Sequence, residues 1–393
     1  MDNITHSLVG VALAELSIGR ASKAQRSLFV GAGIIAANLP DIDLAYAAIT
    51  PPPLGYLLHH RGHTHTVLGL AGLAVALVMA YWFFPAVRKM RFSGRLRFWL
   101  LIAIALASHL ALDALNSYGV HPFYPVDDNW YFGDAIFILE PSLWMLLGIA
   151  AAWNGRSGTA RFAIALPILL LLGASASMGA IPLEMVGLLA VAGGIFAWAA
   201  FGLSPRARAA WGLALCAVII AGFIGASRVA RRAAVAALHQ VLRGPVTDVI
   251  LTPNPASPFC WSVIAVELRE TDAEFVLWRG TLSLAPAWTP PTACGSYRLA
   301  GARADRILGD GGFVLRDTRA QSLTRLRTLA DGDCWVRAWL RFGRAPVVED
   351  GSIYDLRFAE RIGQNFSRME LVPRRGCPAN APAWAMPRAD LLR

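Results

Sequence analysis

The sequence predicts a membrane-embedded α-helical bundle of about seven or eight hydrophobic helices, followed by a mainly β C-terminal domain. Composition is the first reason, because 56% of the 393 residues are hydrophobic and only 16% are charged, whereas soluble domains contain about 25% charged residues. The second is a series of apolar runs, most of them near the roughly 20 residues that a helix needs to span a bilayer. The third is a change of composition after about residue 227, which divides the chain into residues 1–232 and 233–393.

Eight apolar runs account for most of residues 1–232. They cover residues 4–19, 28–49, 67–84, 98–115, 135–153, 162–179, 181–203 and 209–226. The first run is short, so whether it crosses the membrane stays open. Pro40 should end or kink a helix in the second run, and the three prolines at 51–53 should force a non-helical stretch.

Residues 240–375 are expected to be mainly β. Runs rich in β-branched and aromatic residues, punctuated by Gly and Pro, predict strands at residues 261–267, 274–278, 334–340 and 353–358. Residues from Pro378 onward should form a loose tail. Four of the five cysteines lie in this part of the chain, at Cys260, Cys294, Cys334 and Cys377. They fit either disulfides on the non-cytosolic side of a membrane or buried thiols.

Basic residues are concentrated between the apolar runs. The connections at 20–27, 85–97, 154–161 and 204–208 carry Lys or Arg and no acidic residue. The positive-inside rule makes these connections cytoplasmic. If all eight runs cross the membrane, the histidine-rich segments and the C-terminal domain lie at its outer face. This placement of the +10 net charge favours membrane lipids as partners over nucleic acid.

The histidine pattern predicts a site for a divalent metal. Four of the eight histidines fall within residues 59–65, and three others precede residue 122. A lone histidine is usually structural, but seven together with several carboxylates point to metal ligation. Zinc is the expected ion, with one or two bound. The expected ligands are His6, Asp41, Asp43, His59, His63, His65, His109, Asp113 and His121.

Several assignments within this set stay open. Which of the four histidines in 59–65 bind metal is undecided, and Asp2, His60, Asp134 and Glu140 are additional candidates. The spacing of Asp41 and Asp43 would let them face alike, as oxygen ligands, as a bridge between two metals, or as a general base. Arg61 could bind a phosphate or stabilise an anionic transition state.

Four motifs in the first 150 residues resemble the YdjM-like family. They are Asp2-x-x-Thr5-His6, residues 38–43 (Asn-Leu-Pro-Asp-Ile-Asp), residues 59–66 (His-His-Arg-Gly-His-Thr-His-Thr) and residues 108–113 (Ser-His-Leu-Ala-Leu-Asp). The resemblance implies an inner-membrane, metal-dependent hydrolase, and one family member is linked by name to LexA binding. The order of these groups is also similar, more faintly, to the zinc-dependent phospholipase C and P1 nuclease group. That likeness implies phosphodiester cleavage, although the N-terminal Trp ligand and the second His-x-x-x-Asp/Glu motif of that group are missing.

The sequence therefore favours a membrane-bound metal-dependent hydrolase whose unknown substrate is an ester or phosphodiester, lipid-like in character. The alternative is a non-catalytic membrane protein that metal stabilises and that binds or regulates a protein partner. A metal transporter is a third reading, but the liganding groups cluster near one end of the helices. HExxH, GxSxG and P-loop motifs are absent from the sequence, which gives a zincin-type protease, nucleophile-elbow hydrolysis or ATP-driven transport no support.

Overall fold

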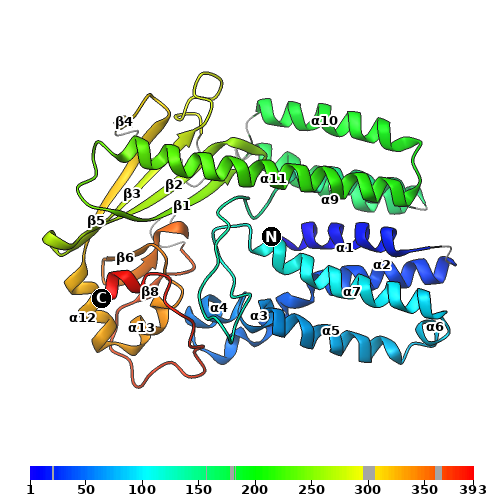
Figure 1. The fold of residues 1–393 in the computed structure, drawn as a ribbon, viewed down its shortest axis with the longest axis horizontal. Helices are drawn as coiled ribbons and strands as arrows, with labels where there is room; N and C mark the ends of the chain where they lie inside the picture. The colour runs from blue at the N-terminus through cyan, green and yellow to red at the C-terminus, as the bar shows by residue number, and fades with distance from the viewer. Residues whose placement is uncertain (20–21, 156, 178–180, 182, 295–305, 359–364) are drawn as a thin grey trace.

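The computed structural model describes residues 1–19, 22–155, 157–177, 181, 183–294, 306–358 and 365–393. Helices gather at one end of the molecule and two antiparallel sheets at the other (Figure 1). The long helix α11 (Pro205–Leu238) runs along the molecule from the helical end to the sheets.

Each of the eight apolar runs contains a helix. In addition to α11, these are α1 (Asn3–Ser17), α2 (Lys23–Asn38), α5 (Val67–Trp82), α7 (Phe92–Asp113), α8 (Pro141–Asn154), α9 (Gly158–Ser177) and α10 (Leu183–Phe201). Several begin at a side chain that accepts hydrogen bonds from the first turn. These caps are Asp2, Ser22, Thr66, Glu140 and Ser204.

The prediction of seven or eight membrane crossings is not confirmed. Among the described residues, four helical stretches are long and apolar enough to span a bilayer: Lys23–Ile49, Phe92–Asp113, Glu184–Phe201 and Pro205–Leu238. A fifth results if Leu54–His65 and Val67–Trp82, bent by 68°, count as one span. Helices α1 and α8, with 15 and 14 residues, are shorter than the roughly 20 residues that a hydrocarbon core requires.

Helices α1 and α2 approach closely enough to bring their ends together. A Cβ atom on Gly10 would lie 2.4 Å from the carbonyl oxygen of Gly33, and one on Gly33 equally near the carbonyl of Gly10. Two facing glycines therefore permit backbone contact that larger side chains would prevent. The result places the beginning of α1 beside the end of α2.

An irregular segment joins α2 to α5. It consists of η1 (Leu39–Ile42), α3 (Asp43–Tyr46), η2 (Ala47–Ile49), α4 (Leu54–His59) and η3 (His63–His65). Pro40 lies in the first turn of η1, where α2 has ended, as the sequence predicts. A short helix, α6 (Pro85–Arg88), follows α5 at the far end of the bundle (Figure 1).

The C-terminal part contains two antiparallel sheets. The larger has the strand order β1-β2-β3-β5-β4 and the smaller β6-β7-β8. Helices α12 (Leu323–Gly332) and α13 (Cys334–Leu340) separate the two sheets in sequence. The strands are β1 (Val246–Asn254), β2 (Ser257–Arg269), β3 (Glu274–Ser283), β4 (Arg306–Leu308), β5 (Phe313–Ser322), β6 (Pro346–Glu349), β7 (Ser352–Asp355) and β8 (Met369–Glu370).

Three expectations for this part need correction. Residues 334–340 form helix α13, because Val336, Trp339 and Leu340 bury one helical face at the spacing of i, i+3 and i+4. The strand expected at 353–358 ends at Asp355 and continues as a 3₁₀ turn. The tail after Pro378 is packed, since the ring of Trp384 is 2% exposed and donates to the carbonyl of Leu58. The strands expected at 261–267 and 274–278 are confirmed.

Disulfides join the four cysteines of the C-terminal part. Cys260 pairs with Cys294, and Cys334 pairs with Cys377. The second bridge fixes the beginning of the C-terminal tail to α13. The sequence allowed either disulfides or buried thiols at these positions, and the structure contains the disulfides.

A buried ionic network connects the helices to the sheets. Both carboxylate oxygens of Asp134 accept from the guanidinium of Arg344, each at 2.8 Å, and Arg231 of α11 donates to Asp134 at 2.9 Å. Arg344 also contacts Asp248 of β1, at 2.8 and 3.0 Å. Asp134, a candidate site residue from the sequence, therefore pairs with arginines.

Replacing Asp134 by Asn should destabilise the protein by about 3 kcal/mol, because it leaves the buried charge of Arg344 undercompensated. Thermal unfolding of the detergent-solubilised protein would show this as a lower Tm. Asp128→Asn is the matched control, since Asp128 is exposed and such changes usually alter stability by less than about 0.5 kcal/mol. If both variants had the same Tm, the stabilising role of the Asp134–Arg344 pair would be contradicted.

Candidate metal site

Four side chains from three segments converge at the end of the helical bundle next to the sheets. Asp41 comes from η1, His65 from η3, and His109 and Asp113 from the last turns of α7. Their ligand atoms all lie within 4.8 Å of one another. Three of the four side chains are buried, and Asp41 is 15% exposed.

The spacing of these atoms suits a tetrahedral ion. The Nε2 atoms of His65 and His109 are 3.0 Å apart. Each lies 3.6 Å from Oδ1 of Asp41, and they lie 3.4 and 3.7 Å from Oδ2 of Asp113. A tetrahedral zinc site with bonds of about 2.0–2.1 Å has ligand atoms about 3.3 Å apart. The four side chains could therefore hold such an ion with little rearrangement.

Hydrogen bonds orient both imidazoles toward this centre. Nδ1 of His109 lies 2.7 Å from the carbonyl oxygen of Ala37, and Nδ1 of His65 lies 3.0 Å from Oδ2 of Asp43. Because these acceptors require a proton on Nδ1, the Nε2 lone pairs are left free for a metal. Carbonyl and carboxylate partners of this kind are typical of metal-binding histidines.

Asp43 organises the histidine-rich segment around it. Its Oδ2 accepts from the backbone N–H of Arg61 at 2.8 Å and from the hydroxyl of Thr64 at 3.0 Å. Its Oδ1 lies 3.3 Å from Nδ1 of His60. Asp41, Asp43 and His60 also form a second group whose ligand atoms lie within 4.8 Å of one another.

Arg61 occupies a strained and buried position beside the four ligands. Its φ is 59°, in the left-handed region that non-glycine residues seldom adopt, and its side chain is 1% exposed. Nε lies 2.9 Å from Oδ2 of Asp113, and Nη1 donates to Oδ1 of Asn116 at 2.8 Å. Strain of this kind persists where surrounding contacts fix it, often at functional sites.

His6 joins the group from α1. Its ring stacks on that of His109 with centroids 3.9 Å apart, and its Nε2 lies 3.3 Å from Oδ1 of Asp113. The side chain is fully buried, and neither ring nitrogen makes a hydrogen bond of ordinary geometry among the described residues. The amino group of Met1 also pairs with Asp113.

The charges of the site favour a divalent cation. Asp41, Asp43 and Asp113 contribute three negative charges, and Arg61 is the arginine that pairs with one of them. Arg61 and the amino group of Met1 supply two positive charges, both paired with Asp113, so the site keeps a net negative charge that a divalent ion would offset. Uncompensated carboxylates are costly at a buried position, so the donor set fits such an ion.

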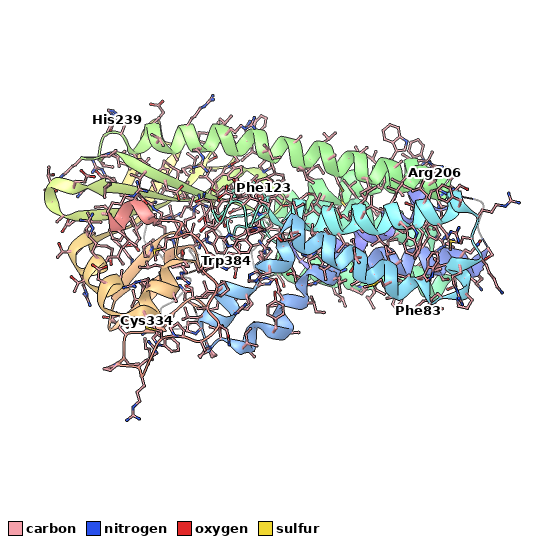
Figure 2. All side chains as sticks on the ribbon, turned by 60° about the horizontal axis from the view of Figure 1, so that its bottom comes forward. Phe83, Phe123, Arg206, His239, Cys334 and Trp384 are labelled. Carbon is pink, nitrogen blue, oxygen red and sulfur yellow. A yellow bond between two sulfur atoms is a disulfide. The ribbon has the colours of Figure 1, made fainter. Side chains whose placement is uncertain are left out.

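Three predicted ligands lie apart from this group. His59 contacts the hydroxyl of Thr50 at 2.8 Å. His63 and His121 pack on the ring of Trp384, with centroids 4.8 and 4.2 Å away. Figure 2 shows Trp384 where the helices meet the C-terminal part. Burial lowers the pKa of His121 to about 3, so this histidine is neutral at physiological pH.

Asp2 and Glu140 serve as helix caps. Asp2 accepts from the first turn of α1 and from the indole N–H of Trp144 at 3.2 Å. Glu140 accepts from the N–H and hydroxyl of Ser142 and from the N–H of Ala256. Burial raises the pKa of Glu140 to about 7, against the effect of these hydrogen bonds.

The structure adds polar residues that sequence reasoning did not select. Asn3 donates to Oδ2 of Asp41 at 2.9 Å. The hydroxyl of Thr64 donates to Asp43, and Asn116 accepts from Arg61. The ring of Tyr118 lies under the guanidinium of Arg61, 4.9 Å away. Asn116 and Tyr118 had a sequence signal in hindsight, because they closely follow Asp113 in a polar stretch.

These features define a membrane protein with a buried His/Asp site at one end of its helices. The chain belongs to the YdjM inner membrane protein family, whose model matches residues 1–181. It is 32% identical over 133 residues to the inner membrane protein YbcI of Escherichia coli. The matched region covers 33% of this chain and 70% of YbcI. It is 25% identical over 164 residues to YfhP of Bacillus subtilis, 40% of this chain and 48% of YfhP. The matched region thus spans about half the length of YfhP.

No solved structure is similar to this chain. The fainter likeness to the zinc-dependent phospholipase C group therefore stays a prediction from the order of the motifs. Family membership supports a location in the inner membrane.

Substituting Asp43 by Asn should weaken zinc binding about 10- to 100-fold, the usual effect of removing the partner of a metal-binding histidine. The amide would present a donor to at least one of the groups that now donate to the carboxylate. Competition with a chromophoric chelator would measure the affinity of the purified protein. Asp128→Asn should bind zinc as the wild type does, and equal affinity of both variants would refute the role of Asp43.

Proposed function

We propose that this chain is a membrane-bound metal-dependent hydrolase that acts on an ester or phosphodiester. Asp41, His65, His109 and Asp113 would hold a divalent ion, with zinc as the expected metal. The observation that carries the proposal is the convergence of two imidazoles, both oriented with Nε2 free, on two carboxylates. A second ion could use Asp41, Asp43 and His60.

A bound divalent ion would act as a Lewis acid and lower the pKa of water. The chain's own groups would handle the proton. Asp41 is 15% exposed, and its Oδ2 is held by Asn3, so we assign Asp41 to proton transfer as well as ligation. Asp43 is fully buried with both oxygens engaged, so we assign it to positioning His65.

We place the site and the C-terminal part at the outer membrane face. The basic connections support this orientation, because Arg26 and Arg208 both donate to Asn154 at the opposite end of the bundle, and Arg206 lies at that end in Figure 2. The two disulfides of the C-terminal part fit a non-cytosolic compartment. Substrate could then reach the site from the lipid phase or from the outer aqueous side.

A non-catalytic role remains the rival proposal, and one observation favours it. Asp113 alone contacts groups from α1, from η3 and from the turn that carries Arg61. An ion at this point would hold these segments together without any reaction, and the C-terminal part could then bind a protein partner. We propose no nucleic acid partner.

Purified zinc-loaded protein should hydrolyse bis(p-nitrophenyl) phosphate or a p-nitrophenyl ester, as measured by nitrophenolate release. His109→Ala should reduce the rate to the uncatalysed background, because the variant lacks one ligand. His239→Ala is the control, since His239 is exposed at the end of α11. If the wild type binds zinc but hydrolyses no ester or diester, while His109→Ala loses the metal, the non-catalytic role is favoured.

A further inference from the structure

Tyr118 has a buried hydroxyl whose hydrogen-bonding capacity is unused. The residue is 7% exposed, and its hydroxyl has no hydrogen-bond partner in the part of the chain that the structure describes. Leaving a buried donor unpaired costs free energy, and native structures contain few such groups. The unpaired hydroxyl of Tyr118 therefore suggests that a bound molecule completes its hydrogen bonding.

The surroundings place the ring of Tyr118 beside Arg61 and the histidine-rich turn. The ring of Tyr118 lies 4.9 Å from the guanidinium of Arg61 and 5.6 Å from the ring of His60. A tyrosine hydroxyl carries its proton at neutral pH and can donate a hydrogen bond.

Arg61 offers a second donor to the same ligand. Its Nη1 donates to the backbone carbonyl of Asp113 and to Asn116, and its Nε, which lies 2.9 Å from Oδ2 of Asp113, makes no hydrogen bond of ordinary geometry among the described residues. Asn116, which holds Arg61, likewise has a buried Nδ2 that makes no hydrogen bond there. Unpaired groups of Asn116 and Tyr118 thus belong to residues that contact the guanidinium of Arg61.

Two partly exposed aromatic rings lie next to His60 and Tyr118. Tyr56 and Phe366 are 42% and 44% exposed, and their rings lie 5.4 Å apart. Tyr56 stacks on His60 at 5.1 Å, and Phe366 stacks over Tyr118 at 6.5 Å.

We propose that Arg61 and Tyr118 form an oxyanion subsite beside the metal ligands, and that it takes the phosphoryl group of a phosphate ester. The inference rests on the proposed function, since a divalent ion would offset the excess of carboxylates and make an anion acceptable. A guanidinium and a phenol supply N–H and O–H donors to a tetrahedral oxyanion, and charge-assisted bonds of this kind are strong.

Binding of inorganic phosphate tests the subsite. Isothermal titration of the zinc-loaded, detergent-solubilised protein should detect phosphate binding, and Tyr118→Phe should weaken it about tenfold, as expected for one hydrogen bond to a charged ligand. The variant keeps the ring over Arg61 and loses a hydroxyl that has no hydrogen-bond partner among the described residues, so it should fold and bind zinc normally. Tyr131→Phe is the matched control, because it deletes the hydroxyl of a tyrosine that donates to Asp127.

Each outcome decides the proposal. Phosphate affinity that Tyr118→Phe leaves unchanged, or zinc-loaded protein that binds no phosphate, would overturn the subsite while leaving the metal site intact. Protein that binds neither zinc nor phosphate would overturn the proposed function as well. Parallel titrations with glycerol phosphate and with phosphatidic acid in mixed micelles would tell a soluble phosphate ester from a lipid headgroup, because the correct source should bind more tightly and lose affinity in Tyr118→Phe.

Discussion

The buried carboxylate of Asp113 is the constraint around which the site is built. A carboxylate removed from water must be compensated by opposite charge and hydrogen bonds, and at the end of α7 the compensation comes from distant segments. Arg61 pairs with it at 2.9 Å from the histidine-rich turn, and His6 lies beside it from α1. The same oxygen that faces Arg61 also faces His65 and His109. Satisfying this one group therefore fixes the relative positions of the segments that carry the candidate ligands.

The C-terminal part completes this arrangement from outside the bundle. Arg357 donates to the carbonyls of Ser117 and Tyr118, at 2.7 and 3.3 Å, and so holds the loop that follows α7. Trp384 packs between His63 and His121 and donates to Leu58. The sheets and the tail thus support the loop and the histidine-rich turn, which explains why a long polar extension belongs to the same structural unit as the membrane helices.

The sequence predicted the helices and the kind of chemistry at the site better than it predicted which residues form the site. Apolar runs are a direct consequence of burial in lipid or core, so all eight contain a helix, although length alone does not decide which ones cross. His65, His109, Asp41 and Asp113 converge as their motifs indicate. His59, His63 and His121 diverge because Thr50 and the tail residue Trp384 compete for them, contacts between residues far apart in sequence. Tyr118 was missed for the same reason, since its role depends on three-dimensional proximity to Arg61.

Zinc K-edge X-ray absorption of the protein purified without added chelator tests the central claim most directly, because it reports the ligands of the ion rather than its presence. Coordination by Asp41, His65, His109 and Asp113, with water completing the shell, predicts nitrogen and oxygen neighbours at about 2.0–2.2 Å and the multiple-scattering pattern of two imidazoles. A sulfur shell at about 2.3 Å, the absence of imidazole scattering, or protein that binds no zinc would contradict the account.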